Sequence, residues 1–263
     1  MLSIPATTLP LLMAATAPAT VDELGLQGCL YLWALLTGQN RRLLVAPTKR
    51  LTLVVLSYLQ ERGIIQLPWP LERWDLDPTA PCTPIENLQW RLTWGAYESD
   101  RLAEALEDYF DTLERDEFAI ALLLRLWTDI GSAETERFFE QQLLKHRFPD
   151  DWAQDIVFAY RECTAITLAQ WRYCAWAAVR RGASYAMQHG PQAEGVREAI
   201  YQELRRRAST VASGAWSGCS FPPSSPHPNS ALAIGFAYQV TRLGPQYWTE
   251  WPSTEVLLGL STG

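Results

Sequence analysis

The sequence predicts a mainly α-helical protein built as a multi-helix bundle. The first observation is that apolar residues recur at helical spacing in one segment after another, and most of these segments end at Gly or Pro. The second is an apolar fraction of 48% beside a charged fraction of 19%, which is typical of a globular chain and not of a disordered one. The 263 residues contain no repeat at the period of a solenoid.

The expected organisation starts with an irregular leader at residues 1–19, followed by a small helical unit at residues 20–90. Thr20, with Glu23 three residues later, fits a capping box and predicts the start of a helix. Apolar residues continue at helical spacing to Gly38, where we expect this helix to end.

A second helix in this unit is predicted over residues 49–62. Gly63 can supply the left-handed residue that ends it, and Ile64 and Ile65 supply the apolar contact that often accompanies such an end. Residues 66–90 are rich in Pro and Trp, which predicts a packed loop or a short hairpin and an internal boundary of the chain.

A helical bundle is predicted over residues 91–209. Gly131 is expected to stop one of its helices, and a break is expected near residues 164–167, where β-branched side chains gather. The stretch 163–179 carries a single charge, Arg172, and is therefore expected to be the central buried helix. The predicted helices cover residues 101–113, 117–130, 133–146, 150–188 and 192–209.

The C-terminal part is predicted to be less regular. Residues 210–230 are rich in Ser, Pro and Gly, which indicates a linker or a long loop. Residues 231–263 are expected to pack on the bundle as a tail, with one short helix before Gly244 and Pro245.

The charge of the chain limits the functions that the sequence can support. The net charge is −7, so broad non-specific affinity for nucleic acid or for an anionic membrane is not expected, although a local basic patch is compatible with either. Lys49 and Lys145 are the only lysines among the 22 basic residues, so nearly every cationic side chain is an arginine.

The cysteines and the N-terminal residues predict a reducing, cytoplasmic location. The five cysteines are widely spaced and form no C-x-x-C pair, which favours buried thiols over a disulfide framework or a zinc site. The apolar stretch near the N-terminus lacks the cationic region of a signal peptide, because the first basic residue is Arg41. This stretch is also too short to span a bilayer, and prolines interrupt it.

Residues 20–75 carry a pattern that is compatible with DNA binding. The first helix is followed by a short basic connection, and the second helix begins with a basic turn and leaves through Gly63. This order resembles the second half of a bacterial winged helix-turn-helix domain, which implies a second helix in the major groove and a wing that begins at residues 64–67. An ordinary helix pair with a glycine cap is the alternative. The residues that the resemblance assigns to phosphate or base contacts are Arg41, Arg42, Lys49 and Arg50.

Two carboxylate motifs form a further pattern. Residues 107–111 place acidic side chains one helical turn apart, where Asp108 and Asp111 could share a divalent cation. In residues 128–136, two hydroxyl side chains and Glu136 follow at four-residue spacing. In a helical, aromatic-rich chain these motifs resemble the metal motifs of class I terpene synthases, which implies a magnesium-dependent enzyme acting on a prenyl diphosphate. A chance arrangement in an acidic helical region is the alternative.

Aromatic and arginine side chains predict an interaction surface. The chain contains 12 Trp, and Trp and Arg are the residues that most often carry binding energy at interfaces. We therefore expect a non-enzymatic interaction or regulatory protein that docks a macromolecular partner, a protein first of all, without a cofactor. DNA binding and the diphosphate enzyme are kept as alternatives. The expected partner surface comprises Trp69, Trp74, Trp90 and Trp94, predicted to be exposed, together with Arg180 and Arg181.

Overall fold

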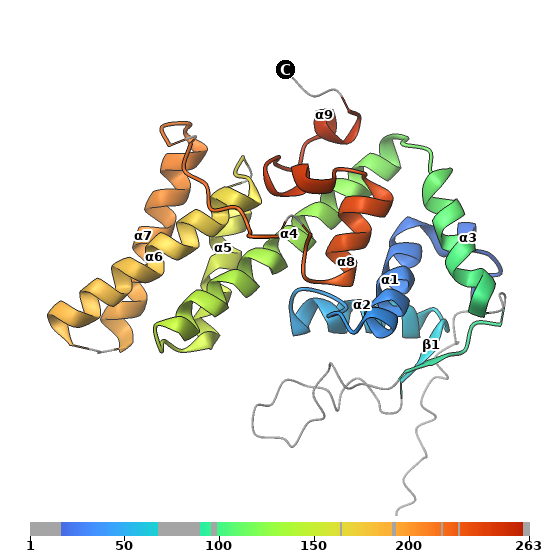
Figure 1. The fold of residues 1–263 in the computed structure, drawn as a ribbon, viewed down its shortest axis with the longest axis horizontal. Helices are drawn as coiled ribbons and strands as arrows, with labels where there is room; N and C mark the ends of the chain where they lie inside the picture. Colours follow the sequence, from blue (N-terminus) through green and yellow to red (C-terminus); the bar gives the residue numbers. More distant parts are fainter. Residues whose placement is uncertain are drawn as a thin grey trace, which may run out of the picture.

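The structure, a computed structural model, describes residues 17–67, 90–95, 99–163, 165–190, 193–216, 218–225 and 227–259. It confirms the mainly α-helical fold (Figure 1). Most of the expected leader, residues 1–16, lies outside the described residues. None of the described helices combines the length and the apolar composition that crossing a lipid bilayer requires.

Helix α1 (Val21–Arg41) begins as the sequence predicts. The hydroxyl of Thr20 accepts a hydrogen bond from the Glu23 backbone N–H at 3.3 Å and so satisfies one of the free donors at the helix start. The helix continues three residues past the predicted end at Gly38. Arg42 adopts the left-handed conformation, with φ of 54°, and ends the helix.

Helix α2 (Lys49–Glu61) leads into a pair of short strands. Its end is confirmed, because Gly63 takes a positive φ of 67° and directs the chain into β1 (Ile65–Gln66). Strand β1 pairs antiparallel with β2 (Arg91–Leu92). The wing predicted to begin at residues 64–67 cannot be followed further, because residues 68–89 of the Pro- and Trp-rich segment lie outside the described residues.

Helix α4 (Glu117–Lys145) follows α3 (Ser99–Asp111) and runs without interruption for 29 residues, which corresponds to about 43 Å. The predicted stop at Gly131 is therefore wrong. Gly131 is needed for packing instead, because a Cβ atom there would lie 2.5 Å from the hydroxyl oxygen of the buried Tyr160. The absent side chain lets Tyr160 pack directly against the helix backbone.

The expected break near residues 164–167 is confirmed. A 3-10 turn, η3 (Asp150–Gln154), and helix α5 (Asp155–Glu162) precede it, and α6 (Leu168–His189) follows it. The hydroxyl of Thr167 accepts from the Gln170 backbone N–H at 3.2 Å, and the Gln170 side chain accepts from the Thr167 N–H at 3.0 Å. This capping box starts α6 and separates it from α5.

Helices α6 and α7 (Ala193–Ala212) pack as a closely spaced pair at one end of the molecule (Figure 1). Helix α6 is buried on most sides from Leu168 to Val179 and is only partly buried beyond it, where Gly182 remains in the core. The central helix of the fold is nevertheless α4, which lies between this pair and the N-terminal helices.

The chain then crosses back toward the N-terminal helices. The irregular segment after α7 is held on α6 by a hydrogen bond from the Phe221 N–H to the Ala169 carbonyl at 2.8 Å. Ser230 forms an isolated parallel bridge with Leu44, in which the Ala231 N–H donates to the Leu44 carbonyl at 2.8 Å. The C-terminal part thereby becomes part of the packing around α1.

Four short helical elements follow this bridge, where one short helix is expected. Trp127 of α4 packs against Phe236 and Tyr247, with ring centroids 6.0 and 6.4 Å apart. The C-terminal elements therefore fill the space between α1 and α4. They are α8 (Ala231–Ile234), the π-helical η4 (Gly235–Val240), the 3-10 turn η5 (Gly244–Trp248) and α9 (Thr254–Leu257).

The contact between α6 and α7 gives a direct test of the packing. A Cβ atom at Gly182 would lie 2.3 Å from Cγ1 of the buried Ile200, so we predict that Gly182→Ala is destabilising. Overpacking costs about 1–3 kcal/mol, and the gain in helix propensity offsets about 1 kcal/mol of it. Chemical denaturation measures the difference. Gly95→Ala is the control, because no atom of the described residues lies within 4 Å of its added Cβ, and an equal loss in both variants would contradict the packing.

Candidate functional site

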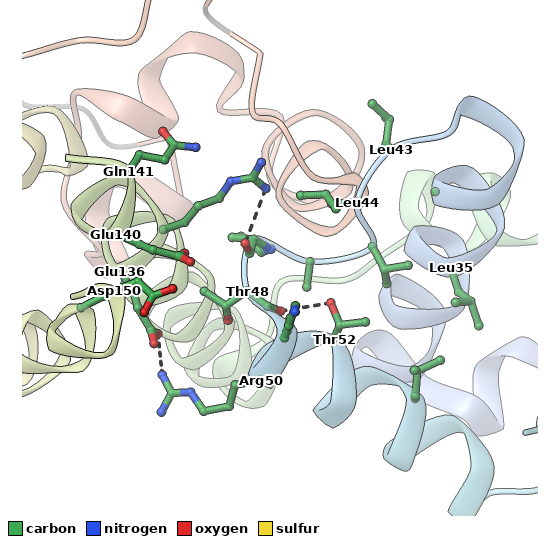
Figure 2. A pocket seen from close by; sticks show the side chains of 18 of the residues that line it. Leu35, Leu43, Leu44, Thr48, Arg50, Thr52, Glu136, Glu140, Gln141 and Asp150 are labelled. Atoms are coloured by element: carbon green, nitrogen blue, oxygen red, sulfur yellow. Dashed lines mark hydrogen bonds and ion pairs between the residues drawn. The ribbon is translucent and has the colours of Figure 1, made fainter. Parts of the chain in front are cut away.

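A large hollow in the described residues lies between the N-terminal helices and α4. Its volume is about 1080 Å³, and it is called the interhelical cleft below. The end of α1, the connection to α2 and the first turns of α2 form one side, whereas α4 and η3 form the other (Figure 2). Such a volume is within the range of sites that bind small molecules or peptide side chains.

One wall of the cleft is acidic. Glu136 and Glu140 lie one turn apart on α4 and therefore share a face, and Asp150 and Asp151 come from η3 (Figure 2). Burial raises the pKa of Glu140, and the neighbouring charges of Asp150 and Glu136 raise it further, while Arg137 and Lys49 oppose this shift. Burial is the largest cause of this pKa shift, and the carboxylates of Asp150 and Glu136 add to it.

The opposite wall is basic. Arg42, Lys49 and Arg50 come from the α1–α2 connection and the start of α2. Arg50 reaches across the cleft and pairs with Glu136 at 2.8 Å, as Figure 2 shows. Arg137 of α4 donates to the carbonyl of Pro47 at 3.5 Å, which is a weak bond. These two contacts link the walls and leave the remaining charges facing the hollow.

Apolar side chains complete the cleft. Leu35 and Leu56 are buried core residues that also line it, and Leu144 of α4 lines it with 53% of its surface exposed. Trp90 is half-buried and lies against the core at the same cleft. The cleft therefore offers both signs of charge next to exposed apolar surface.

The structure brings three of the four predicted nucleic-acid contacts to this cleft. Arg42, Lys49 and Arg50 line it, whereas Arg41 is exposed and does not. Beyond its first turn, the exposed positions of α2 include Val54 and Glu61.

The predicted tryptophan surface is only partly described. Trp94 is 4% exposed, and its indole N–H donates to the Pro18 carbonyl at 2.7 Å, so the expected exposure of Trp94 is wrong. The indole ring can be buried because that carbonyl accepts the hydrogen bond of its one N–H donor. Trp90 is half-buried at the cleft, and Trp69 and Trp74 lie outside the described residues.

Two of the three carboxylates of the predicted magnesium motif form separate ion pairs. Asp111 pairs with Arg242 at 2.6 Å, and Glu136 pairs with Arg50. Asp108 is exposed on α3. Within the described residues, no three His, Cys, Asp or Glu side chains are grouped so that they could hold a metal ion.

The arginines of α6, which include Arg180 and Arg181 of the expected partner surface, differ in their surroundings from those of α7. Arg180 and Arg181 lie in the second half of α6, about two turns before its end, and Arg180 lies over the ring of Trp176 at 4.9 Å. Arg181 is exposed. In α7, Arg206 and Arg207 both pair with Glu203, at 2.8 and 2.6 Å.

A buried acid in α4 is a functional group that the sequence did not single out. Glu134 is 7% exposed, and its Oε1 atom has no hydrogen-bond partner among the described residues. Burial raises its pKa to about 7, although Arg137 and Arg172 act in the opposite direction. The hydroxyl of Tyr247, close enough to interact electrostatically with Glu134, is also buried and has no hydrogen-bond partner in the described part of the chain.

Arg172, the single charge in the stretch 163–179, lies beside aromatic side chains. Its guanidinium lies 4.0 Å from the ring centroid of Phe138, and its Nε atom donates to the Phe221 carbonyl at 3.1 Å. Burial lowers the pKa of Arg172, and the charge of Glu134 opposes this shift. Aromatic faces and a carbonyl therefore compensate this cation in place of a close carboxylate.

The buried carboxyl gives a prediction about pH. The pKa of the Glu134 carboxyl is about 7 in the folded state and 4.5 ordinarily. The stability that the protonated carboxyl contributes to the fold is therefore fully present below pH 4.5, and it is lost as the pH rises through 7. We expect Glu134→Gln, which mimics the protonated acid, to gain on the order of 3 kcal/mol in unfolding free energy relative to wild type between about pH 4 and pH 9. Chemical denaturation at several pH values measures this difference. Glu104→Gln on exposed α3 is the control, and a difference that does not change with pH would contradict the buried charge.

Comparison of the chain with protein-family models, with curated proteins and with solved structures finds no match.

Proposed function

We propose that the protein is a non-enzymatic interaction protein that binds a segment of a protein partner in the interhelical cleft. The observation that carries this proposal is the cleft itself, with its acidic wall, its basic wall and its exposed Leu144. A segment that bears a cationic side chain next to an apolar one would complement these surfaces. Arg and Trp, the residue types most often found at energetic centres of interfaces, also line the cleft.

The acidic wall favours a cationic partner group. Glu140 is destabilised as an anion by burial and by Asp150 and Glu136, so a Lys or Arg side chain placed between these carboxylates would relieve repulsion that the free protein retains. Arg50 already neutralises Glu136, with 53% of its own side chain exposed. An incoming cation would therefore be directed toward Glu140 and Asp150.

Charge reversal tests this proposal. We predict that Glu140→Lys combined with Asp150→Lys weakens partner binding by about tenfold or more, because like charges across an interface cost several kcal/mol. The tagged protein is used to capture partners from its native lysate after nuclease treatment, and the affinity of the identified partner is then measured. The matched control is Glu104→Lys combined with Glu107→Lys on α3, which changes the net charge equally at exposed positions outside the cleft.

Partner binding by the cleft variant is compared with partner binding by the α3 control variant, which shows where the partner binds. Loss of the partner in the cleft variant alone, with the helical circular dichroism unchanged, supports the cleft as the binding site. Equal retention in both variants would show that the partner binds elsewhere. Equal loss in both would point to the overall charge of the protein.

DNA binding is the second candidate, and one observation favours it. Helix α2 begins with Lys49 and Arg50 and is followed by the antiparallel pair β1–β2, an order that resembles part of a winged helix. The carboxylates opposite Lys49 and Arg50 count against it, because they repel phosphates.

The salt dependence of duplex DNA binding tests this second candidate. If Lys49 contacts a phosphate, Lys49→Gln reduces the slope of log affinity against log salt by about one unit. Fluorescence anisotropy with labelled DNA measures the slope, and Arg101→Gln on exposed α3 is the control. An unchanged slope for Lys49→Gln, or captured partners that all survive nuclease, would contradict DNA binding through α2.

A further inference from the structure

A second hollow lies on another face of α4. It has a volume of about 410 Å³ and lies between the end of α4 and the second half of α6; it is called the α4–α6 pocket below. Gln142, Lys145 and His146 line it from α4. Helical periodicity places these residues on a different face from Glu136 and Glu140, so this pocket is distinct from the interhelical cleft.

The charged side chains that line this pocket, Lys145 and Arg180, are both basic. Lys145, His146 and Arg180 line it, and no carboxylate does. Within the described part of the chain, none of these three forms an ion pair with Asp or Glu. In a protein with a net charge of −7, a pocket lined by Lys145 and Arg180 and by no carboxylate of the described residues is a local site for negative charge.

The negative end of the α4 helix dipole explains the position of the basic residues on α4 but not that of Arg180. Lys145 and His146 lie at the C-terminus of α4, where cations are stabilised by the helix dipole. Arg180 belongs to the second half of α6 and is positioned by the ring of Trp176. Two independent elements therefore direct positive charge to the same hollow.

The pocket also has an aromatic and apolar side. Trp176 is half-buried and stacks on Phe221, with centroids 5.9 Å apart and an interplanar angle of 13°. Met187 lines the pocket and is 88% exposed, which leaves an unbranched apolar side chain able to cover a ligand. Gln142 is 6% exposed and brings an amide group to the same lining.

We propose that the α4–α6 pocket binds a small organic anion that carries a phosphate or carboxylate group on a flat apolar body. The anionic group is held by Lys145 and Arg180, and the flat body lies between Trp176 and Met187. Arginine and lysine suit both phosphate and carboxylate groups. The pocket volume suits a ligand of this size. This site is independent of the partner cleft.

Titration with matched aromatic probes tests the site. Isothermal titration calorimetry compares 1-naphthyl phosphate, 1-naphthoate and the neutral 1-naphthalenemethanol. We expect the phosphate or the carboxylate, or both, to bind more tightly than the neutral alcohol, and the tighter of the two identifies the preferred anion. Equal binding of all three probes, or no binding of either anion at millimolar concentration, would overturn the proposal.

Variants locate the binding. Lys145→Gln combined with Arg180→Gln should weaken binding of the anionic probe by about tenfold or more, because hydrogen bonds to charged groups are lost. Arg181→Gln is the matched control, since Arg181 is exposed beside Arg180 and does not line the pocket. If Arg181→Gln weakens binding as much as the double variant, or if the double variant binds like wild type, the anion does not occupy this pocket. Circular dichroism verifies that each variant is folded.

Discussion

The position of helix α4 is the constraint on which the rest of the structure depends. Helix α4 contacts α1, α5, α6 and α9. It therefore lacks the single apolar stripe and the opposite solvent-exposed face of an ordinary surface helix. Its buried residues lie all around its axis, and some of them are polar, including Glu134 and Gln142. Its C-terminal half borders both hollows, and each hollow takes a different face of the same helix.

The contacts between helical elements explain why most basic residues of the chain are arginines and not lysines. Arg115 donates to carbonyl groups of Val240, Thr241 and Leu257, and so fastens the C-terminal elements to the start of α4. Arg207 donates to the hydroxyl of Tyr173 at 2.6 Å as well as pairing with Glu203. A planar guanidinium with several donors can serve two or three acceptors at once, which a lysine ammonium does less readily. Many arginines therefore link elements and are not free for ligands.

Local chemistry explains which parts of the fold could be predicted. The starts of α1 and α6 depend on Thr20 and Thr167, and the end of α2 depends on Gly63, so each signal is contained within a few residues. Gly131 misled the prediction because the reason for its presence, the hydroxyl of Tyr160, lies almost thirty residues away in sequence. Trp94 misled it similarly, because its partner is the carbonyl of Pro18.

The candidate sites could be predicted only in part, for the same reason. The basic residues around Lys49 were recognised as a cluster, but the carboxylates opposite them belong to α4 and η3 and meet them only through tertiary packing. Arg180 was singled out, whereas its neighbours Lys145 and His146 come from another helix. Glu134 carries no local signal, since burial alone makes its carboxyl group unusual.

The bridge between Leu44 and Ser230 has a consequence for how the protein is made. It joins positions that are separated by most of the chain, and the C-terminal elements that follow it bury one side of α1. During synthesis, the N-terminal helices therefore leave the ribosome long before the residues that cover them. At about 5–20 residues per second, the apolar surface of α1 stays uncovered for on the order of ten seconds or more. A chaperone that shields this helix on the nascent chain would fill the interval until the C-terminal elements arrive.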